Sequence, residues 1–169
     1  AARARGALIV APAARANSGP TLDKQPYWDQ ATRALARADP VLRRLVRVHP
    51  GVHLARRSDA FTALARAICG QQISVKAAEA VWRRVVAAAD ASQAGAAFPA
   101  LAPAAVATLG TDALRACGLS ARKALYVGEL ARHFVEGRLD PTSFRALPDE
   151  ALIAALCGVK GIGRWTAEM

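Results

Sequence analysis

The chain has 169 residues, of which 53% are hydrophobic, a composition that suits one globular domain with a buried core. No apolar run is as long as a membrane-spanning helix, which argues against a membrane protein. The net charge of +10 is typical of nucleic-acid-binding proteins. Residues 1–57 hold 11 Lys and Arg against 3 Asp and Glu, whereas residues 58–169 hold 12 against 10. The excess charge is therefore concentrated near the start.

The first 24 residues are rich in Ala and Arg, and we expect them to form a disordered leader. Their apolar patch, residues 7–11, is too short for the core of a signal peptide. The chain begins without Met, which suggests a fragment or a processed start. We expect a cytoplasmic protein, associated with the nucleoid if it is bacterial. The three cysteines form no zinc pattern, and all are expected to be reduced and buried: Cys69, Cys117 and Cys157.

Residues 25–60 predict N-terminal helices, over 28–37 and 40–48. In the second of these, Leu42, Leu45 and Val46 are expected to face inward.

Two amphipathic helices follow along the chain. Ser58 is expected to cap the first, which ends at Gly70, and Ser74 to cap the second. Their predicted inward faces are Phe61, Leu64, Ala65 and Ile68, and then Val75, Ala78, Trp82 and Val85.

Three further helices have clear start and stop signals. Pro103 starts a short one, Thr111 caps the next, which ends at Gly118, and Ser120 caps a third, which stops at Gly137. The last of them has a regular inward face of Val127, Leu130, Ala131 and Phe134. No segment alternates like a β-strand. The predicted fold class is all-α, a compact orthogonal helical bundle.

The last thirteen residues, CGVKGIGRWTAEM, predict a helix–hairpin–helix (HhH) motif at the C-terminal end. A short helix opened by Pro148 precedes the hairpin, and Gly158 is expected to end it in a left-handed conformation. The apolar face of this helix is predicted to hold Leu152, Ala155 and Leu156.

Gly161 and Gly163 can take backbone conformations closed to other residues, so that nearby N–H groups point at a phosphate. Ile162 between them is expected to be buried and to anchor the hairpin. Lys160 and Arg164 add positive charge beside the anion. For a Gly-x-Gly pattern alone, an ordinary glycine-rich turn is the alternative.

Gln71 and Gln72 lie in the turn between Gly70 and Ser74, where packing explains two adjacent amides poorly. Their side chains could enter a duplex and take the hydrogen bonds of a displaced base. A polar surface turn is the alternative.

Three segments together resemble the helix-hairpin-helix (HhH-GPD) DNA glycosylase superfamily, and most of all its alkylated-base branch, 3-methyladenine DNA glycosylase II. They are FTALARAICGQQISVKAA at 61–78, GLSARK at 118–123 and GVKGIGRWTA at 158–167. The resemblance makes residues 61–169 a glycosylase domain, which we expect to be incomplete at its C-terminus.

The resemblance implies a base-excision repair enzyme that binds double-stranded damaged DNA and flips one alkylated base into a pocket. The enzyme would then hydrolyse the N-glycosidic bond of a 3-methyladenine or 7-methylguanine type of base. The positions that would contact DNA are Gln71, Gln72, Lys160, Gly161, Gly163, Arg164 and Thr166.

Trp165 occupies the position at which lyase-competent relatives carry a lysine that attacks the sugar. Because tryptophan has no amine, the resemblance implies a monofunctional hydrolase, with Trp165 in the base pocket. The indole would also attract a cationic methylated base. No cofactor is required. The resemblance further implies a structural Na⁺ or K⁺ ion at the backbone carbonyls of Cys157, Val159 and Ile162.

The family's catalytic aspartate follows the hairpin after a helix and a loop, so we expect it beyond Met169. Asp149, Glu150 and Glu168 do not match its position. The 169-residue chain is therefore expected to be inactive alone, and a monomer is the expected state. The alternative is a non-catalytic HhH module that binds DNA, and a third reading is an all-helical interaction protein. Salt-dependent DNA binding would separate the third from the first two.

Overall fold

The computed structural model describes residues 24–53, 59–96 and 99–169, and the predicted leader lies almost wholly outside these ranges. The described elements are helices with no β-strand among them, which confirms the predicted all-α class. In chain order they are α1 (Trp28–Ala38), α2 (Pro40–Val48), α3 (Ala60–Gly70), α4 (Val75–Ala89), η1 (Ala91–Gln93), α5 (Pro103–Ala116), α6 (Ala121–Val135), η2 (Phe144–Ala146), α7 (Asp149–Cys157) and α8 (Arg164–Glu168). None of the described helices has the length and apolar character needed to cross a bilayer.

The chain divides into two compact units, residues 1–56 and 57–169. In the first, α1 and α2 form a helical pair. Asp39 caps α2 by accepting hydrogen bonds from the backbone N–H groups of Val41 and Leu42, at 2.6 and 3.0 Å. The predicted inward face of α2 is wrong for Leu45 and Val46, which are 49% and 42% exposed. Two short helices bury little surface, so these side chains remain accessible to solvent.

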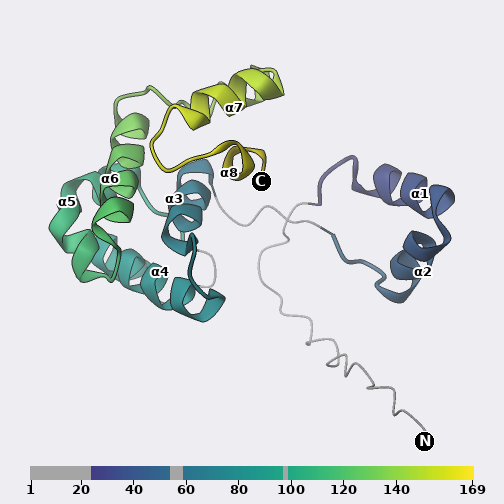
Figure 1. Cartoon of the computed structure of the whole chain (residues 1–169), viewed down its shortest axis with the longest axis horizontal. Coiled ribbons are helices and arrows are strands. Elements are labelled where there is room, and N and C mark those ends of the chain that lie inside the picture. The colour runs from purple at the N-terminus through teal and green to yellow at the C-terminus, as the bar shows by residue number, and fades with distance from the viewer. Residues whose placement is uncertain (1–23, 54–58, 97–98) are drawn as a thin grey trace, which may run out of the picture. The chain divides into compact units, whose positions relative to one another are not determined.

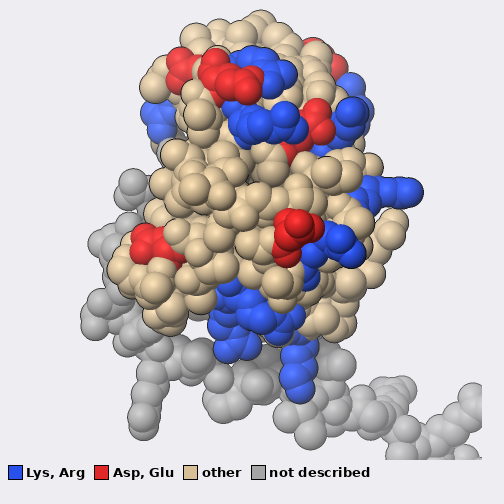
Figure 2. Space-filling view, turned by 90° about the vertical axis from the view of Figure 1, so that its left-hand side faces the viewer, with Lys and Arg blue, Asp and Glu red and all other residues tan. Residues whose placement is uncertain are grey.

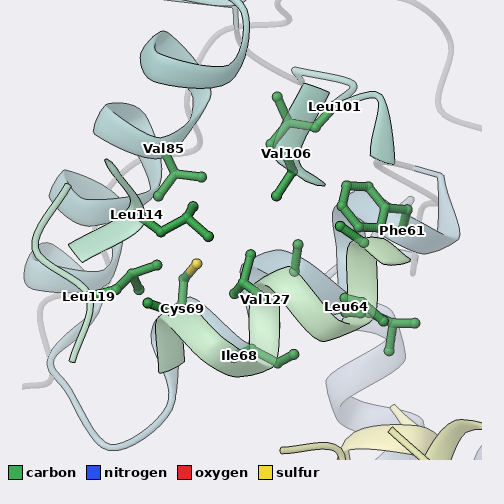
Figure 3. Packing of buried hydrophobic residues seen from close by; sticks show 14 of the residues in the cluster. Phe61, Leu64, Ile68, Cys69, Val85, Leu101, Val106, Leu114, Leu119 and Val127 are labelled. Carbon is green, nitrogen blue, oxygen red and sulfur yellow. The ribbon is translucent and has the colours of Figure 1, made fainter. Parts of the chain in front are cut away.

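The second unit contains a single core built by α3 to α7 and the hairpin. Figure 3 shows side chains of α3, α4, α5 and α6 converging, among them Phe61, Ile68, Val85 and Val127. Each fully buried side chain of this size contributes about 1.5–3 kcal/mol relative to an exposed one. The other members of the core fill the gaps between these anchors and are largely Val, Leu and Ala.

Helix α3 is capped by Asp59, so the predicted cap at Ser58 is wrong. The Asp59 carboxylate accepts from the backbone N–H of Thr62 at 2.9 Å, three residues into the helix. The Thr62 hydroxyl donates to the same carboxylate at 2.7 Å and accepts from the backbone N–H of Leu101 at 2.9 Å. This buried hydroxyl therefore joins α3 to the segment before α5.

Thr62→Val is expected to lower the free energy of unfolding by about 1–3 kcal/mol, because it leaves the buried N–H of Leu101 without an acceptor. Thr62→Ser keeps the hydroxyl and is expected to cost less than about 1 kcal/mol for the lost methyl group. Urea denaturation of both variants makes the comparison. Equal stability of the two would show that the hydroxyl contributes nothing.

The start of α4 lies outside the core. Ser74 caps this helix as predicted, with its hydroxyl 3.3 Å from the backbone N–H of Ala77. Val75 is 88% exposed, so its predicted place on the inward face is wrong. The predicted Ala78 is half-buried, and the buried stripe begins six residues after Val75, at Val81, and includes Val86 as well as the predicted Trp82 and Val85.

Helices α5 and α6 pack side by side (Figure 1). Gly110, with φ 73°, kinks α5 at the point where the sequence predicted one helix to end and another to begin. The Ser120 hydroxyl caps α6, and the predicted inward face is confirmed for Val127, Leu130 and Ala131. Phe134, the fourth predicted residue, is partly buried and meets the ring of Phe61 edge-on at 5.3 Å.

The three cysteines are free thiols, as predicted, but they differ in exposure. Cys69 and Cys117 are buried, whereas Cys157 is exposed, which corrects the prediction for that residue. Burial raises the pKa of Cys69 to about 12, and burial also raises the pKa of Cys117. Both buried thiols are therefore protonated and unreactive at neutral pH.

Candidate nucleic-acid interface

The hairpin between α7 and α8 is anchored by two apolar side chains. Val159 and Ile162 are both buried, as predicted for Ile162, and the Ile162 N–H donates to the Val159 carbonyl at 3.1 Å. The predicted face of α7 is confirmed for Leu156, which is buried, and Leu152 is partly buried, but Ala155 is exposed. The hairpin, rather than α7, carries most of the anchoring at this end of the unit.

The two hairpin glycines have different roles. Gly161 has φ 91°, and a Cβ atom there would lie 2.3 Å from Cδ2 of the Tyr126 ring. Gly163 has φ −93° and open space around it, so the expectation of a glycine-only conformation is wrong at that position. Gly158 was expected to end α7 in a left-handed conformation, but it is right-handed, at φ −64°. The left-handed residue is Gly161. Of these three glycines, only Gly161 is therefore required by both its backbone conformation and its packing.

Helix α8 begins directly after Gly163. The first N–H groups of a helix have no intrahelical acceptor, which leaves them available to an anion. Lys160 is exposed beside this end of α8, and no ion pair involves it within the described ranges. The hairpin therefore combines backbone donors with one free positive charge.

Arg164 is held by two carboxylates. Its guanidinium donates to both oxygens of Glu150, at 2.6 and 3.0 Å, and to Glu168 at 2.7 Å. The hydrogen bond from Arg164 keeps the pKa of Glu150 below its ordinary value, and the bonds to Glu150 and Glu168 raise the pKa of Arg164. These groups are exposed, so the ion pairs are weak. They nevertheless offset the positive charge predicted to lie beside a phosphate.

The Gln71–Gln72 turn meets the hairpin, although the two segments are far apart in sequence. The Gln71 side-chain amide donates to the Gly161 carbonyl at 2.8 Å. Gln72 has φ 55°, a left-handed conformation that is uncommon for a residue other than glycine, and its side chain is exposed. Only Gln72 therefore presents a free amide to solvent.

Sequence reasoning did not identify two residues of α6 that support this arrangement, Lys123 and Tyr126. The Lys123 ammonium donates to the carbonyls of Cys69 and Gln71, at 2.9 and 2.6 Å. Tyr126 packs against Gly161. The segment GLSARK included Lys123, but nothing local to that segment indicates which backbone atoms its ammonium reaches.

A pocket of about 620 Å³ lies between the α3–α4 turn and α8. Its lining is mostly apolar and includes Gln71, Gln72, Ile73, Glu79, Trp165 and Met169. Trp165 is 74% exposed, so its indole offers an accessible ring face and is not a core tryptophan. Arg66 and Glu79, which also line the pocket, form an ion pair of 2.7 Å. The structure thus places Trp165 next to the two glutamines.

The charge around this unit is mixed. On the face shown in Figure 2, most of the surface is uncharged, acidic side chains lie beside basic ones near the top, and Lys and Arg side chains gather at the lower end. In the parts of the chain that the structure describes, no group of three or more His, Cys, Asp or Glu side chains could hold a metal ion. A cation at the hairpin would therefore depend on backbone oxygen atoms.

The Gln71 side chain thus joins the α3–α4 turn to the glycine hairpin, and residues that follow the hairpin line a pocket together with that turn. Residues 65–165 match the family described as HhH-GPD superfamily base excision DNA repair protein. The chain belongs to this superfamily, as the three sequence segments predicted.

Two curated relatives share the greater part of the chain. DNA-3-methyladenine glycosylase 1 of Schizosaccharomyces pombe is 36% identical over 115 residues, covering 67% of this chain and 47% of that protein. DNA-3-methyladenine glycosylase of Saccharomyces cerevisiae is 37% identical over 122 residues, covering 66% and 38%. The chain thus spans less than half the length of these relatives.

Solved structures agree with the sequence comparison. The S. pombe 3-methyladenine DNA glycosylase in complex with abasic DNA has a TM-score of 0.68 at 31% identity, covering 82% of this chain and 66% of that one. DNA-3-methyladenine glycosidase of Bacillus halodurans has a TM-score of 0.66 at 31% identity, covering 81% and 60%. The helical fold of this chain is therefore similar to that of these 3-methyladenine DNA glycosylases.

Proposed function

We propose that this chain is part of a base-excision repair DNA glycosylase that hydrolyses the N-glycosidic bond of alkylated bases flipped from duplex DNA. The observation that carries the proposal is the 2.8 Å hydrogen bond between Gln71 and Gly161. It brings the turn that would enter the duplex next to the hairpin that would grip its backbone. The relatives named 3-methyladenine glycosylases support 3-methyladenine as a substrate, and 7-methylguanine is proposed beside it.

The hairpin is the proposed phosphate grip. Backbone N–H groups around Gly161, Gly163 and the start of α8 would bind one phosphate, with Lys160 adding charge. Thr166, in the first turn of α8, would contribute a hydroxyl. Arg164 would contact DNA only by exchanging the carboxylates of Glu150 and Glu168 for a phosphate. Such contacts carry no sequence information, which suits an enzyme that must act at any sequence.

Trp165 is the proposed wall of the base pocket. Its exposed indole could stack on a flipped base and would attract a positively charged methylpurine through a cation–π interaction of about 0.5–2 kcal/mol. Trp165 has no amine with which to attack the sugar, so the proposed enzyme is monofunctional and leaves an intact abasic strand.

The proposed catalytic aspartate, which would stabilise positive charge on the sugar and orient water, lies beyond Met169. The carboxylates near the pocket and hairpin are already engaged: Glu79 with Arg66, and Glu150 and Glu168 with Arg164. A Na⁺ or K⁺ ion at the backbone carbonyls of Cys157, Val159 and Ile162 is part of the proposal, since carbonyl oxygens suit such cations. The ion would neutralise the bound phosphate, and no other cofactor is proposed.

The proposed partner is damaged duplex DNA, bound by a monomer. Alkylated duplex DNA should be incubated with the 169-residue chain and with a chain carried on to the stop codon of its reading frame. The longer chain is expected to release 3-methyladenine or 7-methylguanine and to leave strands that break only on treatment with alkali. The 169-residue chain is expected to bind DNA in a salt-dependent manner and to release no base.

Each outcome of this assay decides a separate part of the proposal. Strand nicking with a borohydride-trapped adduct would show a lyase and contradict the monofunctional mechanism. Base release by the 169-residue chain would show that the catalytic carboxylate is among the residues present. DNA binding without release by either chain would favour the non-catalytic HhH module.

A further inference from the structure

Helix α6 supports the turn before α4 through one charged side chain. The Lys123 ammonium reaches the Cys69 carbonyl at 2.9 Å and the Gln71 carbonyl at 2.6 Å. Both carbonyls belong to the end of α3, where backbone oxygens lack intrahelical donors. A positive charge at a helix C-terminus also interacts favourably with the helix dipole. Lys123 therefore closes α3 and holds the turn at the same time.

The same face of α6 supports the hairpin. Tyr126 lies three residues after Lys123, so both side chains project from one side of the helix. The Tyr126 ring packs so closely on Gly161 that no Cβ atom would fit between them. The Gln71 amide also binds the Gly161 carbonyl. The turn, the hairpin and α6 are therefore each in contact with the other two.

This arrangement separates the two glutamines. The side chain of Gln71 is committed to the Gly161 carbonyl and is partly buried. Gln72 is exposed in a left-handed conformation, which persists only where neighbouring contacts hold the backbone. Those contacts are the ones that Lys123 and Gln71 make on its N-terminal side.

We propose that Lys123 is a positioning residue for lesion recognition, which sets the turn at a constant distance from the hairpin so that Gln72 enters the duplex beside the gripped phosphate. The proposal rests on the proposed function. It assigns the duplex-entering role to Gln72 and a structural role to Gln71, and it makes Lys123 act on DNA through Gln72 rather than by its own charge.

The first test needs no DNA. In Lys123→Met, amide hydrogen exchange at Gln71 and Ile162, whose N–H groups donate to the Ile68 and Val159 carbonyls, is expected to become about tenfold faster, because two hydrogen bonds from a charged group to the turn are lost. Arg122→Met is the matched control, since it removes one positive charge from the neighbouring position, where the side chain is exposed and forms no ion pair with a described residue. It is expected to leave exchange at these sites unchanged.

The second test measures binding to an undamaged duplex and to a duplex with a stable abasic-site analogue. Lys123→Met and Gln72→Ala are each expected to lower the preference for the abasic site about tenfold. The double variant is expected to lose no more of this preference than either single variant. Arg122→Met is expected to change both affinities by the same factor. Lys123→Arg keeps the charge but not the compact ammonium, and it is expected to lose only part of the preference.

The outcomes separate this proposal from the function on which it rests. Equal loss of affinity for both duplexes in Lys123→Met, or additive losses with Gln72→Ala, would overturn the positioning role while leaving DNA binding intact. Unchanged amide exchange would overturn it without reference to DNA. A wild-type chain with no salt-sensitive DNA binding would overturn the proposed function, and the lesion-recognition role with it, even where exchange responds as expected.

Discussion

Gly161→Ala is expected to lower the free energy of unfolding by about 3 kcal/mol, from a left-handed backbone penalty together with overpacking. The backbone φ is 91°, and the new Cβ atom would lie 2.3 Å from the Tyr126 ring. Either the ring or the hairpin must move, and a moving hairpin also breaks the bond from Gln71. Thermal unfolding should show a midpoint lower by roughly 10–20 °C for a domain of this size.

Gly163→Ala is the matched control for this change. Its φ of −93° suits alanine and no atom lies within 4 Å of the added methyl, so stability is expected to change by less than about 0.5 kcal/mol. Equal destabilisation by the two substitutions would contradict the structural distinction between the glycines.

Combining Gly161→Ala with Tyr126→Ala separates the two causes of the Gly161 effect. Removal of the ring relieves the clash but not the backbone penalty, so part of the loss from Gly161→Ala should disappear in the Tyr126→Ala background. The measurement is a double-mutant cycle on the free energy of unfolding. Strict additivity would mean that the ring and the new methyl group never meet.

Trp165→Ala is expected to slow release of a cationic methylated base about 30-fold, which corresponds to about 2 kcal/mol of lost stacking and cation–π attraction. Because Trp165 is 74% exposed, stability is expected to change little. The measurement is single-turnover release of 7-methylguanine by the chain carried on to its stop codon. A large effect on release with unchanged unfolding distinguishes a site residue from a packing residue.

Trp165→Phe tests the physical cause of this effect. Phenylalanine keeps a π-face and is expected to retain much of the rate, whereas an uncharged damaged base should lose less than a cationic one on Trp165→Ala. Equal losses for charged and uncharged bases would remove the cation–π contribution. Unchanged release in Trp165→Ala would place the base elsewhere than in this pocket.

Local chemistry explains why most helices could be predicted from the sequence. The caps at Ser74 and Ser120 need only a hydroxyl and a backbone N–H three residues later, so neighbouring residues decide them. The face of α6 follows from helical spacing. Ser58 and Asp59 are adjacent and both are good capping residues, so local sequence did not show that Asp59 is the cap of α3.

Predictions failed where a second segment decided the outcome. Val75 has the spacing of a core residue, but among the described residues no element covers its side chain. The role of Arg164 as a phosphate ligand stays a prediction, and local sequence did not show that Glu150, fourteen residues earlier, reaches its guanidinium. Gly158 and Gly161 are both suitable for a left-handed turn. The structure has it at Gly161, the glycine against which the Tyr126 ring packs.

The sequence by itself determined the all-α class, the family and the presence of the glycine hairpin, because these depend on short-range spacing and on residue types. Only the tertiary structure decided which glutamine is free, since Gln71 binds a carbonyl ninety positions away. The link between turn and hairpin through Lys123 and Tyr126 was equally absent from any local pattern. Hydrogen bonds and steric contacts of this kind act over a few ångströms in space, whatever the separation along the chain.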